Sequence, residues 1–164
     1  MTTTVQSLSR AAHRRNLLAG VLFGLGTVAF LDEVVFHQLL HWHHFYDKST
    51  SDVGLVSDGL FHAFSWFATV AASFNVMRLV RAGAFQRLTF FGGWLTGVGF
   101  FQLYDGLVQH KALGLHQIRY DVNLVPYDIT WNVIASVLLL SGIALTIITS
   151  RRSQHTSQPS GADT

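Results

Sequence analysis

The chain has 164 residues and a formal net charge of +2; 49% of its residues are hydrophobic and only 12% are charged. Soluble domains carry about 25% charged residues, so this composition excludes an ordinary soluble domain and indicates an integral membrane protein. The chain has no cysteine, so disulfides and thiolate ligands are excluded and any metal site must use nitrogen and oxygen atoms.

Four apolar stretches follow one another along the chain. Each is long enough to cross a hydrocarbon core, which takes about 20 helical residues. We place these spans at residues 17–41, 56–80, 88–110 and 128–149. Residues 1–15 form a basic leader, and residues 151–164 form a polar tail that we expect to be disordered. The sequence therefore predicts an all-α fold, an integral membrane four-helix bundle over residues 16–150.

The basic residues lie mostly at one set of helix ends. Eight arginines flank the termini and the middle loop, namely Arg10, Arg14, Arg15, Arg78, Arg81, Arg87, Arg151 and Arg152. Only Lys48, Lys111 and Arg119 flank the opposite ends. The positive-inside rule then predicts cytoplasmic termini, with most histidines and acids at the outer side. The basic residues are topology signals, and we expect no nucleic-acid partner.

An internal repeat relates the first and third spans. A shift of 73 residues places nine of the 24 residues from 20 to 43 on identical residues. The matched polar pairs are Asp32 with Asp105, His37 with His110, and His43 with His116. A shift of 70 relates the second and fourth spans more weakly, with Asp58 on Asp128. A two-helix repeat in which both copies have the same orientation predicts a pseudo-twofold axis along the membrane normal.

Glycines recur four residues apart in both copies of the repeat. Gly20 and Gly24 in the first span match Gly93 and Gly97 in the third. Small residues at this spacing let helix backbones approach closely in lipid. We therefore expect a close contact between the first and third spans.

Ionisable residues gather near the outer ends of the spans. Each costs about 2.5–3.5 kcal/mol at the centre of a bilayer on insertion scales, so such residues normally face the bundle interior and pair. The candidate metal ligands are His37, His62, His110 and Asp58, supported by Asp32, Asp105, His41 and His116. A second tier comprises Glu33, His43, His44 and Asp128. For any single residue the alternative is a packing role, and for His43 and His44 a place in the interfacial aromatic belt.

Helical spacing groups these candidates. Residues one turn apart share a face: Glu33 with His37 and His41, and Asp58 with His62. Asp32 and His37 are five residues apart, about 140° around a regular α-helix, as are Asp105 and His110. We therefore expect the two members of each pair to face different neighbours, with the acid orienting a histidine of another span.

Imidazole and carboxylate ligands without sulfur suit a transition metal. The leading hypothesis is a transition-metal-binding membrane protein, and zinc, copper(II), iron and manganese all suit these ligands. The competing hypothesis is a metal-dependent membrane oxidoreductase or hydrolase that uses the same cluster. Two lesser alternatives are a proton relay and a haem held by His37 and His110.

Three motifs taken together resemble a known family. They are Asp32-Glu33-x-x-x-His37-Gln38-x-x-His41-Trp42-His43-His44, Ser57-Asp58-Gly59-x-x-His62 and Tyr104-Asp105-Gly106-x-x-x-His110-Lys111. Over about residues 16–150 the chain resembles the four-span bacterial membrane proteins called domain of unknown function 2243. The resemblance implies a bacterial plasma (inner) membrane location and, as partners, haem-copper oxidases or their copper-inserting assembly factors. It therefore favours copper, with zinc or iron as alternatives, and a role in metal handling or respiratory oxidase assembly. It assigns no activity to any residue, and it leaves a homo-oligomer open.

Overall fold

The regular elements in the described part of the chain are all helices. The computed structural model describes the backbone of residues 2–155 and the side chains of residues 10–152. Its elements are α1 (Thr2–Asp32), η1 (Glu33–Leu39), α2 (Ser51–Arg81), α3 (Arg87–Tyr104), η2 (Asp105–Ala112) and α4 (Leu124–His155), where η1 and η2 are π-helices. The predicted all-α fold is confirmed.

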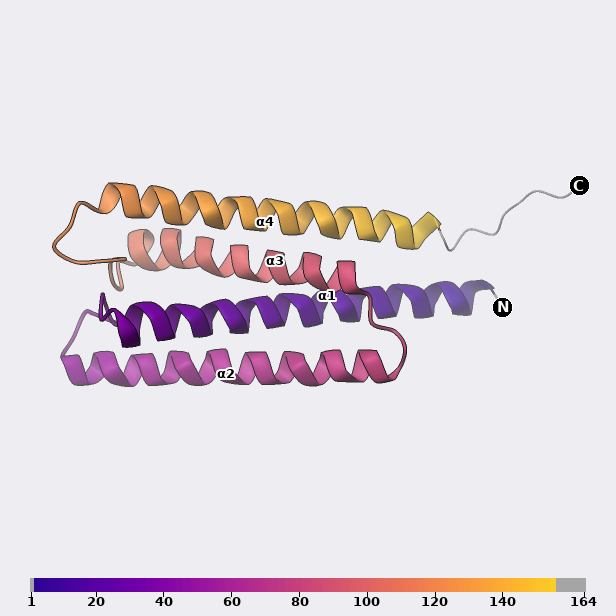
Figure 1. Ribbon diagram of the computed structural model, residues 1–164, viewed down its shortest axis with the longest axis horizontal. Helices are drawn as coiled ribbons and strands as arrows, with labels where there is room; N and C mark the ends of the chain where they lie inside the picture. The colour runs from indigo at the N-terminus through magenta and orange to yellow at the C-terminus, as the bar shows by residue number, and fades with distance from the viewer. Residues whose placement is uncertain (1, 156–164) are drawn as a thin grey trace, which may run out of the picture.

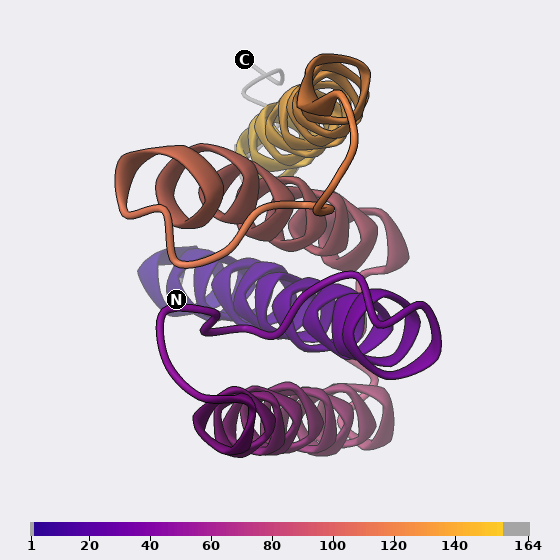
Figure 2. The same cartoon turned by 90° about the vertical axis from the view of Figure 1, so that its left-hand side faces the viewer.

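The four α-helices run side by side in a row (Figures 1 and 2). α1 and α3 form the central pair, α2 packs on α1, and α4 packs on α3. Both η1 and η2 lie at the same end of the row, together with the α1–α2 and α3–α4 connections. The candidate ligands at the ends of the central pair are therefore brought together by the packing of α1 on α3.

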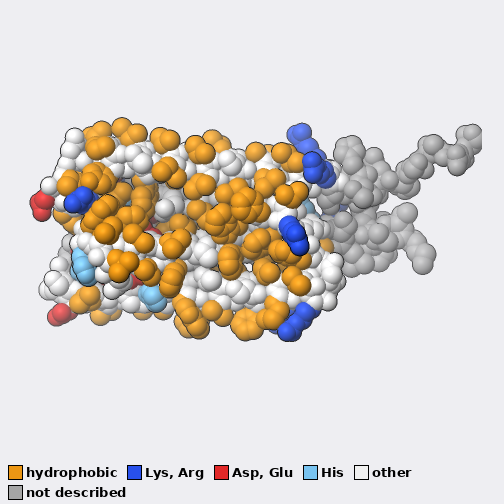
Figure 3. All heavy atoms as spheres, viewed as in Figure 1, with side chains coloured by type: hydrophobic (Ala, Val, Ile, Leu, Met, Phe, Trp, Pro, Cys, Tyr) orange, Lys and Arg blue, Asp and Glu red, His pale blue; other side chains and the backbone are white. Residues whose placement is uncertain are grey.

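In the part of the chain that the structure describes, three helices are long and apolar enough to cross a membrane. They cover Arg10–Leu39, Ser51–Arg81 and Leu124–Arg152. Large apolar side chains such as Leu60, Phe67 and Leu140 are exposed, and apolar atoms cover most of the face in Figure 3. α3 is shorter and is not among the three candidates, so a fourth span at 88–110 stays a prediction.

The two predicted flanking segments continue into helices. Residues 2–15 belong to α1, so the basic leader forms the first turns of that helix. α4 continues to His155, so the first five residues of the predicted tail are helical, and residues 156–164 lie outside the described residues.

Glycines allow the central pair to touch backbone to backbone. A Cβ atom at Gly24 would collide with the backbone of Trp94, and a Cβ atom at Gly97 would collide with the backbone of Val21. The predicted close contact between the first and third spans is confirmed. Val21 and Trp94 are themselves 73 residues apart, so the two contacts mirror each other; this agrees with the repeat, which stays a prediction.

Substitution of one of these glycines tests the contact. Gly97→Ala should lower the free energy of unfolding by about 1–3 kcal/mol, because the added methyl group must push the α1 backbone away. Thermal unfolding of the detergent-purified protein measures the change. Gly59 is the matched control, since a Cβ atom there meets nothing within 4 Å and Gly59→Ala adds only helix propensity. Equal unfolding temperatures for the two variants would contradict the proposed packing.

Candidate metal centre

α1 and α3 both change to a π-helix at the same relative position. Leu40 N donates to Val35 O at 2.9 Å, and Leu113 N donates to Val108 O at 2.8 Å, five residues back in each case. The residue that follows each turn has a positive φ, +50° at His41 and +56° at Gly114, and the chain reverses there. Such π-helical turns are rare and frequently occur at functional sites.

The π-helical turns bring each five-residue Asp/His pair together. Asp105 Oδ2 lies 3.0 Å from His110 Nε2, and Asp32 Oδ2 lies 3.7 Å from His37 Nε2. The expectation that the members of each pair face different neighbours is therefore wrong. It assumed a regular α-helix, whereas the wider π-turn rotates the fifth residue back over the first.

Four buried histidines form the centre of the site: His37, His43, His110 and His116. The ring centroids of His37 and His43 are 4.6 Å apart, and those of His110 and His116 are 4.7 Å apart. The cross distances, His37 to His116 and His43 to His110, are 6.2 and 6.1 Å. The rings of His43 and His116 stack at 4.5 Å with an interplanar angle of 7°. The geometry is thus nearly symmetric between the two halves of the chain.

Two of these histidines tie the loops together through matched hydrogen bonds. His43 Nδ1 donates to Ile118 O at 3.0 Å, and His116 Nδ1 donates to Phe45 O at 2.9 Å. A carbonyl oxygen can only accept, so each Nδ1 carries the proton and each Nε2 keeps its lone pair. Burial, together with the nearby His116, His37 and His110, lowers the pKa of His43 to about 2, so this imidazole is neutral.

Several buried nitrogens of the cluster have no hydrogen-bond partner among the described residues. They are both ring nitrogens of His110, Nε2 of His116 and Nε2 of His37. His110 Nε2 is close to Asp105 but is not aligned for a hydrogen bond. One ligand atom each from His43, His110 and His116 lies within 4.8 Å of the others, so the three imidazoles could hold one metal ion.

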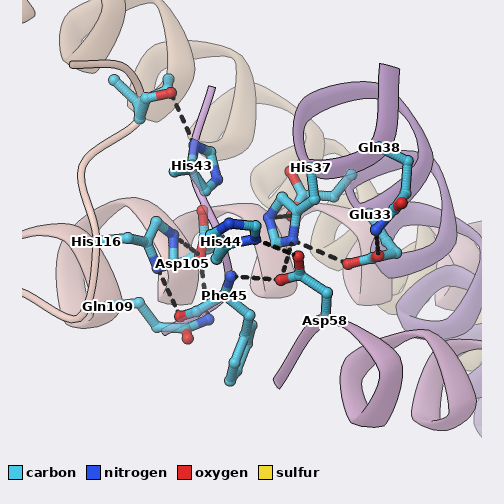
Figure 4. Close-up of polar contacts among 12 residues, drawn as sticks. Glu33, His37, Gln38, His43, His44, Phe45, Asp58, Asp105, Gln109 and His116 are labelled. Atoms are coloured by element: carbon cyan, nitrogen blue, oxygen red, sulfur yellow. Dashed lines mark hydrogen bonds and ion pairs between the residues drawn. The ribbon is translucent and has the colours of Figure 1, made fainter. Parts of the chain in front are cut away.

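A second group of possible ligands lies on the other side of His37. His37 Nδ1 is 2.9 Å from Glu33 Oε2 and 3.1 Å from Asp58 Oδ1. Asp58 also lies 2.6 Å from His44 Nδ1 and accepts a hydrogen bond from Phe45 N at 2.7 Å (Figure 4). Glu33, His37 and Asp58 are all fully buried, and their ligand atoms lie within 4.8 Å of one another.

The remaining candidates lie away from both groups. His62 packs its ring against Phe30 at 5.4 Å, and His41 is exposed at the chain reversal. Asp128 forms an ion pair with Lys111 at 2.6 Å. Asp58 therefore meets His37 and His44 instead of His62, its neighbour one turn along the helix.

Two contributions were underrated or missed by sequence reasoning. His43, ranked in the second tier, lies at the centre, and its match to His116 in the repeat was the signal for it. Gln109 donates to Asp105 Oδ1 at 3.0 Å and is 2% exposed. The repeat pairs Gln109 with Phe36, so no pattern in the sequence distinguishes it.

A cavity at the loop end borders the four-histidine cluster. It has a volume of about 420 Å³ and is lined by His41, Trp42, His43, His44, Asp47 and Tyr120. Of the four clustered histidines, His43 belongs to this lining. The centre is covered by loops, not by a helix.

Fold and site together define an all-α membrane protein with a buried centre of histidines and carboxylates at one end. The chain belongs to the family described as Predicted membrane protein (DUF2243), whose family model matches residues 19–149. This confirms the resemblance inferred from the motifs. No curated protein and no solved structure matches the chain.

Asparagine and alanine substitutions separate the structural role of the loop histidines from ligation. Asparagine places an amide N–H near the position of Nδ1, so His116→Asn should keep the bond to Phe45 O and unfold close to wild type. His116→Ala should lose about 1–3 kcal/mol, because a buried carbonyl loses its donor. Thermal unfolding in detergent with excess chelator measures both without a metal contribution. An alanine variant as stable as the asparagine variant would show that this bond contributes nothing.

Proposed function

We propose that this protein binds a transition metal ion, copper by preference, through His43, His110 and His116. The observation that carries the proposal is the convergence of three buried imidazoles from three separate segments, with nitrogen atoms that lack partners. Each ring nitrogen buried without a hydrogen-bond partner lowers the stability of the folded protein by about 1–3 kcal/mol. A bound cation removes that cost and gives the cluster its physical reason.

The hydrogen bonds around the cluster also support metal binding by these histidines. Metal-binding histidines usually donate their other ring N–H to a carbonyl or carboxylate, which fixes the tautomer. His43 and His116 do this through Ile118 O and Phe45 O, and the aligned Nε2 atoms remain free to ligate. Asp105, close to both His110 and His116, supplies negative charge beside the ion.

The all-nitrogen ligand set supports copper over the alternatives. Imidazole suits copper, zinc, iron and nickel, and divalent affinities normally rise to a maximum at copper. Zinc and iron remain the alternatives. When bound, the metal would supply Lewis acidity or, for copper and iron, redox chemistry.

The position of the centre supports a role in metal handling. It is covered by loops and bordered by a cavity of about 420 Å³, a shorter path to solvent than the middle of the helix row would offer. We further propose that metal exchanges through this cavity at the outer face of a bacterial plasma membrane, with haem-copper oxidases or their assembly factors as recipients. The arginines near the termini support cytoplasmic ends.

An enzyme is the second candidate because an apolar cavity reaches the other side of the cluster. This cavity of about 530 Å³ lies between α2 and α3, and its lining includes Phe45 and Gln109, both joined to cluster residues by hydrogen bonds. A lipophilic substrate entering from the bilayer would approach the metal there. Turnover by the copper-loaded protein would favour this candidate; exchange without turnover favours metal handling.

Metal content tests the proposal directly. Detergent-purified protein is stripped with chelator, loaded with copper, zinc or iron at equal concentration, desalted and measured by elemental mass spectrometry. His110→Ala and His116→Asn should lose one copper equivalent, with affinity reduced by more than the ~10–100-fold expected when only a hydrogen-bond partner of a ligand is lost. His116→Asn is informative because its fold should survive.

His62→Ala is the matched control, since His62 is a histidine at the same end of the molecule but outside the cluster. It should keep the wild-type copper content. Near-zero copper in every protein would overturn the proposal and leave a proton relay along the Asp/His cluster as the better explanation. Labelling that places the 45–55 loop in the cytoplasm would overturn the outward orientation.

A further inference from the structure

Three carboxylates at the end of the α1–α2 pair are buried with little positive charge nearby. Asp32, Glu33 and Asp58 are 5%, 1% and 1% exposed. Within the described residues, their ion pairs involve only histidines. Burying carboxylates costs several kcal/mol each unless they are paired, so this group calls for a cation.

The other half of the chain supplies such a cation from its own side chains. There Asp128, which the repeat pairs with Asp58, lies 2.6 Å from Lys111. In the first half the position matched to Lys111 is Gln38, a neutral residue. The position matched to Glu33 is Gly106, which has no side chain. At these two matched positions the first half therefore has one more carboxylate and one ammonium group fewer.

The carboxylates are oriented toward one point. Gln38 Nε2 donates to Glu33 Oε1 at 2.8 Å, which leaves Oε2 facing His37. Oε2 is buried and has no hydrogen-bond partner among the described residues. Phe45 N holds Asp58 Oδ1 at 2.7 Å, 3.1 Å from His37 Nδ1 (Figure 4). A backbone donor holds Asp58 and an amide donor holds Glu33, and both carboxylates lie within 3.1 Å of His37 Nδ1.

We propose that Glu33, His37 and Asp58 form a second metal site, distinct from the three-histidine centre. Two carboxylates and one imidazole favour a divalent ion that accepts mixed oxygen and nitrogen ligands, such as Mn²⁺, Fe²⁺ or Zn²⁺. The ligands differ from those of the first site, so the second site can be filled when the first is empty. The rings of His37 and His43 lie 4.6 Å apart between centroids, so the two proposed sites would be neighbours.

Isosteric substitutions test this second site. Stripped protein is loaded with copper plus manganese, and separately with copper plus zinc, and both metals are counted. Wild type should hold a manganese or zinc equivalent that His110→Ala retains. Glu33→Gln and Asp58→Asn should lose that equivalent and keep copper, because each keeps its shape and loses one charge. Asp128→Asn is the matched control and should keep both metals.

The two proposals fail in different ways. If Glu33→Gln and Asp58→Asn hold the same manganese and zinc as wild type, the second site is overturned and His37 is simply an imidazolium between two carboxylates. If His110→Ala and His116→Asn hold as much copper as wild type, while Glu33→Gln and Asp58→Asn lose the manganese or zinc equivalent, the three-histidine proposal fails and the second site stands. Unfolding temperatures measured in chelator identify any variant that has lost its fold. If one of Glu33→Gln and Asp58→Asn has lost it, the metal content of the other variant decides the result.

Discussion

Four glycines let the backbones of α1 and α3 touch, and the arrangement at the histidine end depends on that contact. In lipid there is little hydrophobic gain from pressing two helices together, so close van der Waals contact must replace it. The contact fixes the relative height of the two helices. Because of this, the π-turns that end them lie side by side, and the histidines that follow can cross from one half to the other.

The π-turns bring together acids and histidines that are five residues apart in the sequence. In a regular α-helix an acid and a histidine five residues apart point in different directions, and the chain would present single polar groups to several neighbours. The widened turn places each acid over its histidine, as in the 3.0 Å approach of Asp105 to His110. The left-handed residue after each turn then folds the loop back, so that His43 and His116 reach the centre.

The two halves of the chain are nearly symmetric at the histidines but differ at the carboxylates. The four histidines keep matched ring distances in both halves. The carboxylates differ: Asp128 forms an ion pair with a lysine, whereas among the described residues the ion pairs of Asp58 and Glu33 are with histidines. A symmetric scaffold with one altered half can therefore offer two kinds of ligand set within a few residues of each other.

The sequence by itself determined the all-α membrane fold, the close helix pair and the set of polar residues from which the site is drawn. These follow from local quantities: apolar length, glycine spacing and the cost of ionisable residues near lipid. Only the tertiary structure decided which residues meet. His62 has the right type and spacing but packs on Phe30, while His43, outside any regular helix, lies at the centre. The reason is that its place depends on a π-turn and on hydrogen bonds to residues about 75 positions away, such as that to Ile118. No periodicity in the sequence encodes these contacts.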